Sequence, residues 1–165
     1  MTITEIIQLI TLIIIVIGAI IAFKQIQDQH ELYRREKALS YSSLYRPEIQ
    51  EIKKKLNVNF DIGSREGPIP KEEFEEKLKE NQELGSYLSA YLNYYENISL
   101  AYFYNLADED VLFHLISGSL IDSRKKLMNY IDFRREQTKI PELYTNLEKL
   151  SERWEGMKGD CRKST

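Results

Sequence analysis

The sequence has little of what builds disulfide frameworks, metal clusters or histidine chemistry. Its 165 residues include one cysteine, Cys161, and two histidines, His30 and His114. A single cysteine excludes both an intramolecular disulfide and a cysteine metal cluster, and it fits a reducing cytoplasm. Four prolines and seven glycines are too few for a collagen-like or low-complexity chain. The 23 Lys and Arg nearly balance the 26 Asp and Glu, so we expect no duplex nucleic acid partner.

Charge is missing altogether between Ile6 and Phe23. As a helix this segment is ~27 Å long, close to the ~30 Å hydrocarbon core of a bilayer. A cleaved signal peptide is the competing interpretation, but it needs a basic start and a small-residue cleavage site. Glu5 is the one charged residue before the segment, and no Ala-x-Ala site follows it. We therefore predict one retained transmembrane helix.

The charges on either side of this segment predict its orientation. No Lys or Arg precedes it, whereas Lys24, Arg34, Arg35 and Lys37 follow it. Positive residues flanking a membrane helix stay on the cytoplasmic side. We expect a single-pass protein of the bacterial inner membrane, with its N-terminus outside and its C-terminal domain in the cytoplasm.

Most of the few polar or small residues in the segment fall on one face of the helix. They are Gln8, Thr11, Gly18 and Ala22. Small residues let membrane helices approach closely, and Gln and Thr can form hydrogen bonds between them. This pattern predicts a homo-oligomer, for which a tetramer is one candidate, and a pore would require several copies. The alternative is that Gln8 reaches the lipid headgroups and the small residues are accidental.

The remainder of the chain predicts an all-α fold in two parts. Residues 1–45 form the transmembrane helix and a stalk, and residues 46–165 form a helical cytoplasmic domain. No segment shows strand alternation of useful length. The first predicted helices cover 24–45 and 47–56. Another starts at Lys71 and continues or restarts after Gly85 as a tyrosine-rich segment to Phe103. The last two are 109–137, after the N-cap Asp108, and a helix that starts at Pro141. Residues 57–70 are the predicted loop, with an extended piece around 58–62.

Nothing in the sequence favours catalysis. The hydrolase, zinc-protease, phosphate-loop and dinucleotide motifs are all missing, and the two histidines fall on different predicted elements. His114 lies on an otherwise apolar helix, where we expect a hydrogen-bonded core side chain. We predict no enzyme activity, no catalytic residues, no cofactor and no metal site.

A ligand site has a better basis in the sequence. Basic residues cluster between 124 and 135, and Arg124 and Arg135 are three helical turns apart, so they share a face. Guanidinium groups pair with phosphate oxygens, and tyrosine rings offer stacking surfaces for bases. The predicted ligand-binding residues are Arg124, Lys125, Arg134, Arg135, Tyr91 and Tyr95. The alternative is that the tyrosines form the core and the basic residues are solvated or contact anionic lipids.

Five stretches between Tyr91 and Trp154 carry a resemblance. They read LNYYENISLA, DEDV, IDSR, NYIDFR and LEKLSERW. This pattern resembles a bacterial family of unknown function whose members have one N-terminal membrane span and a helical cytoplasmic domain. The resemblance implies an architecture and no activity.

The overall layout is also similar to the membrane effectors of type III CRISPR systems. That similarity implies a cytoplasmic domain that senses a cyclic oligoadenylate and an oligomeric membrane helix that disrupts the bilayer. The leading hypothesis is thus an antiviral membrane effector gated by a cyclic oligonucleotide. The second is a non-enzymatic membrane-anchored adaptor that docks a protein partner.

Overall fold

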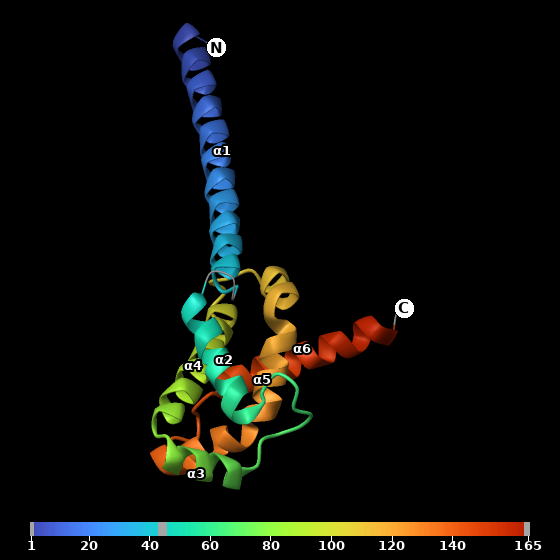
Figure 1. Cartoon of the computed structure of the whole chain (residues 1–165). Helices are drawn as coiled ribbons and strands as arrows, with labels where there is room; N and C mark the ends of the chain where they lie inside the picture. Colours follow the sequence, from blue (N-terminus) through green and yellow to red (C-terminus); the bar gives the residue numbers. More distant parts are fainter. Residues whose placement is uncertain (1, 43–45, 164–165) are drawn as a thin grey trace.

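The computed structural model describes residues 2–42 and 46–163, and within these residues the chain is all-α. Figure 1 shows one long rod standing on a bundle made by the other helices. The helices are α1 (Ile3–Ser40), α2 (Pro47–Phe60), α3 (Lys71–Glu80), α4 (Glu83–Phe103), α5 (Glu109–Thr138) and α6 (Thr145–Lys163). No strand occurs in the described residues, so the predicted fold class is confirmed.

The rod is α1, and its apolar side chains pack against nothing in this chain. Every side chain described from Thr2 to Tyr33 is exposed. Among the described helices, α1 is the one long and apolar enough to cross a membrane. A core helix of a soluble domain would bury these residues, so α1 is not such a helix.

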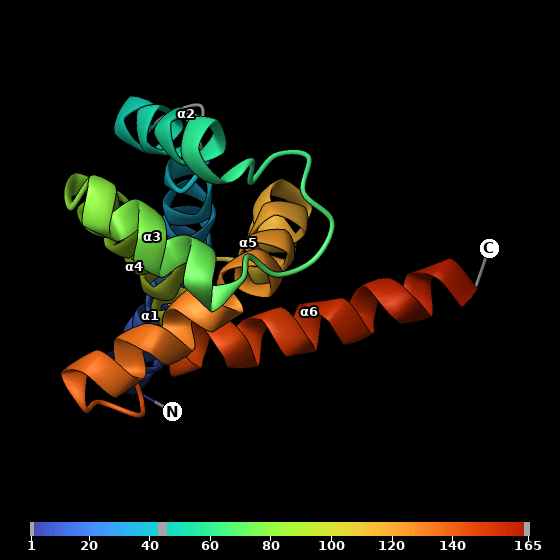
Figure 2. The ribbon, with the colours of Figure 1, turned by 60° about the horizontal axis from the view of Figure 1, so that its bottom comes forward.

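The core of the domain is built around α4. This helix buries residues on most of its circumference: Leu84, Leu88, Tyr91, Leu92, Tyr94, Tyr95, Ile98, Ser99 and Ala101. Helices α2, α3 and α6 pack against α4, while α5 packs against α1, α3 and α6. In Figure 2, α6 crosses the bundle and its later turns project away from it. Among the side chains of α6 that the structure describes, the last fully buried one is Trp154.

The rod is fixed to the domain where α1 passes the loop between α4 and α5. The Arg34 side chain donates from Nη2 to the Ala107 carbonyl at 3.3 Å, and the Asp108 amide donates to the Arg34 carbonyl at 3.1 Å. Ala38 is fully buried beyond this point, and the Tyr94 hydroxyl donates to the carbonyl of Tyr41. The rod is therefore packed directly on the domain.

Asp108 also begins α5, as the sequence predicts. Its Oδ1 accepts from the Val111 amide at 3.0 Å, and its Oδ2 lies 3.9 Å from Nε of Arg35. One carboxylate thus caps a helix of the domain and contacts the rod.

Two predicted boundaries are wrong. Helix α2 continues through the predicted extended piece to Phe60, because Leu56 and Phe60 lie one turn apart and both are buried. Asp61 then ends the helix in a left-handed conformation, with φ at 51°. The predicted end of the stalk, residues 43–45, lies outside the described residues.

The last helix begins at Thr145, four residues after the predicted start at Pro141. Glu96 of α4 explains the position, because its carboxylate accepts from the Leu147 amide and from Nδ2 of Asn146, both at 2.8 Å. A carboxylate at a helix N-terminus is favourable for the free amides there.

Candidate functional site

Three of the four predicted basic residues of α5 face acidic residues of α6. Arg124 lies 3.5 Å from Glu152, and Lys125 forms an ion pair with Glu155. The shared face that the sequence predicts exists, but it is turned toward α6, whose carboxylates balance its charge.

Arg135 makes the most complete of these contacts. Its guanidinium donates to both carboxylate oxygens of Glu148, at 3.2 and 2.6 Å, and its Nε donates to the Leu143 carbonyl at 3.0 Å. The hydrogen bonds with Glu148 raise the pKa of Arg135 above its ordinary value, so the charge is permanent. This bidentate pair joins the end of α5 to the start of α6.

Arg134 differs from its neighbours. Its Nη1 donates to Oε1 of Gln137 at 2.7 Å, and no carboxylate in the described part of the chain pairs with it. Its Nε is buried without a hydrogen-bond partner, as is Nε of Arg124. Arg134 is thus the predicted ligand residue whose charge is still unpaired.

The two predicted ligand tyrosines lie in the core. Tyr91 and Tyr95 are both buried, and their rings meet edge to face at 5.1 Å. The Tyr91 hydroxyl lies 3.3 Å from that of Tyr95 and 3.1 Å from Oγ of Ser123, and burial raises its pKa. Neither ring has a free surface on which a base could stack, and neither joins the basic face that points to α6.

The histidines lie apart and on the surface. His114 is exposed, with its ring centroid 5.8 Å from that of Phe113, so the prediction of a core side chain is wrong. The helix turns it outward, whereas Leu112 and Ile116 on either side are buried. His30 is exposed on α1. Within the described residues, no three His, Cys, Asp or Glu side chains are grouped to hold a metal ion.

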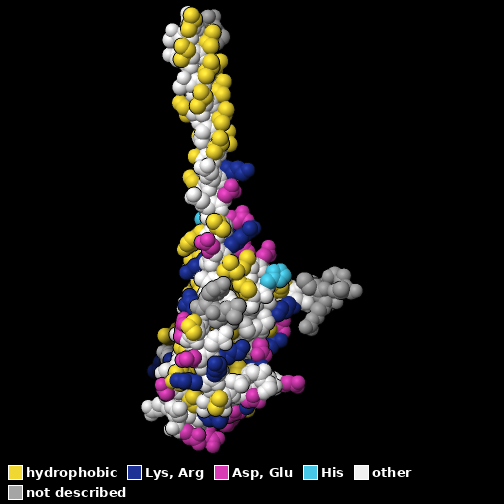
Figure 3. Space-filling model, turned by 45° about the horizontal axis from the view of Figure 1, so that its top comes forward, with side chains coloured by type: hydrophobic (Ala, Val, Ile, Leu, Met, Phe, Trp, Pro, Cys, Tyr) yellow, Lys and Arg dark blue, Asp and Glu magenta, His cyan; other side chains and the backbone are white. Residues whose placement is uncertain are grey.

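The predicted oligomer face of α1 is fully available. Gln8, Thr11, Gly18 and Ala22 are exposed, and a side chain added at Gly18 would meet no atom of this chain within 4 Å. In Figure 3 this part of the rod carries no charged side chains, and the first charges come further down. The hydroxyl of Thr11 donates to the Ile7 carbonyl of its own helix at 2.9 Å.

The domain lies on the other side of α1 from this face. Its contacts with α1 involve Arg34 and Ala38. At ~100° per residue, Arg34 lies ~140° and Ala38 ~180° around the axis from the midpoint between Gly18 and Ala22. The same face therefore continues down the stalk without meeting the domain.

Two features of the site were missed in the sequence. Glu148, Glu152 and Glu155 recur at a spacing of four and three, so they form an acidic face that matches the basic one. That spacing could have predicted the pairing of α5 with α6. The second feature is a cavity of about 430 Å³ between α3, α4 and α5, beside Arg134.

A protein family model described as a domain of unknown function, DUF4760, matches residues 12–154. The chain belongs to the DUF4760 family. The match begins inside the apolar segment and ends at Trp154, so the DUF4760 unit includes part of the rod as well as the bundle. Searches among curated proteins and among solved structures find no match.

Proposed function

We propose that this DUF4760 protein is a non-enzymatic, self-associating membrane adaptor. Helix α1 spans the bacterial inner membrane with its N-terminus outside, and the helical domain stands in the cytoplasm to dock a protein partner. The absence of Lys and Arg before Ile6, with Lys24, Arg34, Arg35 and Lys37 after Phe23, supports this orientation.

One observation carries the proposal: the oligomer face and the domain lie on different sides of one continuous helix. Copies can meet along Gly18 and Ala22 in the membrane and along Gln25 and Gln29 in the stalk. The domains then point outward, where partners can reach them. The direct contact between Arg34 and the α4–α5 loop keeps each domain in that position.

The same geometry argues against lipid contact by the basic residues of α5. With Phe23 at the edge of the hydrocarbon, Arg34 stands ~16 Å further along the axis, beyond a headgroup layer of ~5–8 Å. Helix α5 runs away from the membrane end of the bundle (Figure 1). Its basic residues contact α6 instead.

The cyclic-oligonucleotide effector is the alternative to the adaptor. It requires Arg124, Lys125 and Arg135 to exchange α6 carboxylates for phosphates, and a ligand would have to offset the loss of the Glu148 pair. This cost is the reason for which we favour the adaptor.

Titration of the full-length protein in detergent micelles with cyclic tetra-adenylate separates the two functions. We expect no saturable binding of the nucleotide at micromolar concentrations, because three of the four predicted basic ligand residues of α5 are already paired with carboxylates of α6. Saturable binding that disappears in the Arg124→Glu, Arg135→Glu double variant would favour the effector and count against the adaptor.

Self-association is tested by adding bulk to the oligomer face. We expect Gly18→Leu to weaken association of the full-length protein at least ~10-fold, because a larger side chain separates the helices. The monomer itself has room for the side chain. Analytical ultracentrifugation in micelles gives the association constant.

Ala19→Leu is the matched control, since it introduces the same side chain ~100° around the helix from Gly18. It should leave the association constant within about twofold of the wild type. Equal weakening by both variants, or by neither, would refute this face as the contact.

A further inference from the structure

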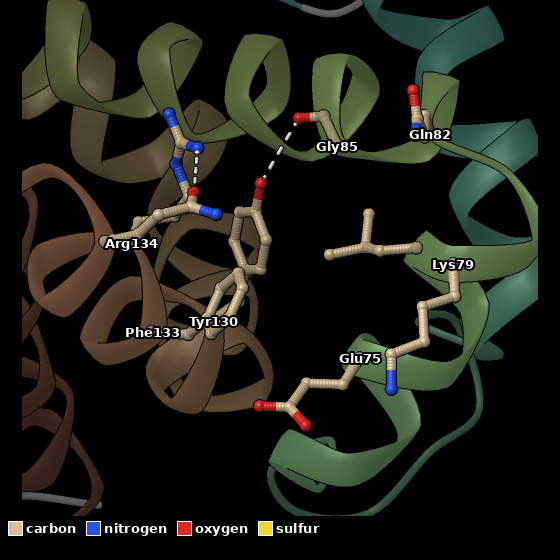
Figure 4. A pocket seen from close by; sticks show the side chains of 9 residues that line it. Glu75, Lys79, Gln82, Gly85, Tyr130, Phe133 and Arg134 are labelled. Atoms are coloured by element: carbon tan, nitrogen blue, oxygen red, sulfur yellow. Dashed lines mark hydrogen bonds between the residues drawn. The ribbon is translucent and has the colours of Figure 1, made fainter.

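The cavity between α3, α4 and α5 is a further site, at the end of the bundle away from the membrane helix. It has a volume of about 430 Å³, within the range of small-ligand pockets. Its walls come from three helices that join there: Glu75, Leu78, Lys79, Gln82, Gly85, Tyr130, Phe133, Arg134 and Gln137. Figure 4 shows Arg134 on one side of the cavity and Lys79 on the other.

The apolar part of the lining suits a flat ring. Leu78 comes from α3, and Tyr130 and Phe133 come from α5, with their two ring centroids 6.1 Å apart at an angle of 32°. The Tyr130 hydroxyl is anchored by the Gly85 carbonyl at 3.2 Å, so its ring is held in place. Aromatic side chains gain from stacked or edge contacts with another ring.

The charged part of the lining suits one negative charge. Arg134 and Lys79 are cationic and Glu75 is anionic, so the cavity carries one net positive charge. Arg134 uses Nη1 for Gln137 and has no carboxylate partner in the described part of the chain. Arg124, Lys125 and Arg135 have such partners in α6, which marks Arg134 as the α5 cation left for a ligand.

We propose that this cavity binds a small aromatic monoanion, with its ring on the partly exposed Leu78 and Phe133 and its carboxylate on Arg134. Glu75 disfavours ligands with several negative charges. Lys79 adds a second favourable charge from the opposite wall. This site goes beyond the adaptor function and does not depend on it.

The test uses full-length protein in detergent micelles and three probes in isothermal titration. Indole-3-acetate carries the ring and the charge, indole-3-acetamide carries the ring alone, and acetate carries the charge alone. We expect saturable binding of indole-3-acetate, at least ~10-fold weaker binding of the amide, and none of acetate, since a charged hydrogen bond contributes that much.

Two variants locate the site. Arg134→Met should lower the affinity for indole-3-acetate at least ~10-fold, to that of the amide, whereas Arg124→Met, whose guanidinium faces Glu152, should leave it unchanged. The helix content measured by circular dichroism should be the same in both.

Three results would overturn the proposal: no saturable binding of indole-3-acetate at millimolar concentration, equal binding of the acid and the amide, or equal affinity in Arg134→Met and wild type. Oligomer size in the Arg134→Met variant should equal that of the wild type. The proposed self-association in the membrane is therefore tested independently of this site.

Discussion

Replacement of Trp154 by alanine is expected to lower the free energy of unfolding by ~3–5 kcal/mol. The Trp154 side chain is 0% exposed, and none of the described α6 side chains after it is fully buried. Its ring meets those of Tyr102 and Phe113 edge to face, at 6.3 and 5.8 Å. It therefore joins α6 to both α4 and α5, and truncation leaves a cavity where the three helices meet.

Urea unfolding of the full-length protein in micelles, followed by far-ultraviolet circular dichroism, measures this loss. Tyr104→Ala is the control, because Tyr104 is 72% exposed and its truncation should change the free energy by no more than ~0.5 kcal/mol. A loss below ~1 kcal/mol in Trp154→Ala would contradict the packing of α6 described above.

Replacement of Arg135 by methionine is expected to lower the free energy of unfolding by ~2–3 kcal/mol. The side chains of Arg135 and Glu148 are only 19% and 24% exposed. Their bidentate contact and the bond from Nε to the Leu143 carbonyl are all lost in this variant. The Glu148 carboxylate then stays largely buried without its partner.

Lys125→Met is the matched comparison, since it removes a cation of the same helix from a pair with α6. The side chains of Lys125 and Glu155 are 49% and 47% exposed, and such pairs contribute only ~0–1 kcal/mol. The double variant Arg135→Met, Glu148→Leu should recover part of the loss, because it leaves no unpaired charge. Equal effects of Arg135→Met and Lys125→Met would show that the Glu148 pair has no structural importance.

Local signals in the sequence predicted the fold class and several helix ends. Pro47 and Asp108 begin helices where expected, because the first-turn proline and the capping carboxylate act within one turn. The start of α6 was missed because Glu96, which caps it, is distant in sequence. Local patterns contain no information on such a partner.

The candidate site was predicted less well for the same reason. Helical spacing placed Arg124 and Arg135 on one face, and the structure agrees. The sequence did not show what covers that face, since that depends on how α6 folds back on α5. The cavity beside Arg134 is likewise formed by helices that meet only in the folded domain.

Cysteine cross-linking along the stalk tests the central claim, that copies meet on the face of α1 opposite the domain. Single cysteines are placed at positions 25–30 in a Cys161→Ser background, and disulfide dimers are measured in oxidised membrane vesicles. We expect the highest yields at Gln25 and Gln29, which continue the Gly18 and Ala22 face. The lowest yield should occur at Gln27, about 160° around the helix from both. A maximum at Gln27, or no dimer at any position, would contradict the account.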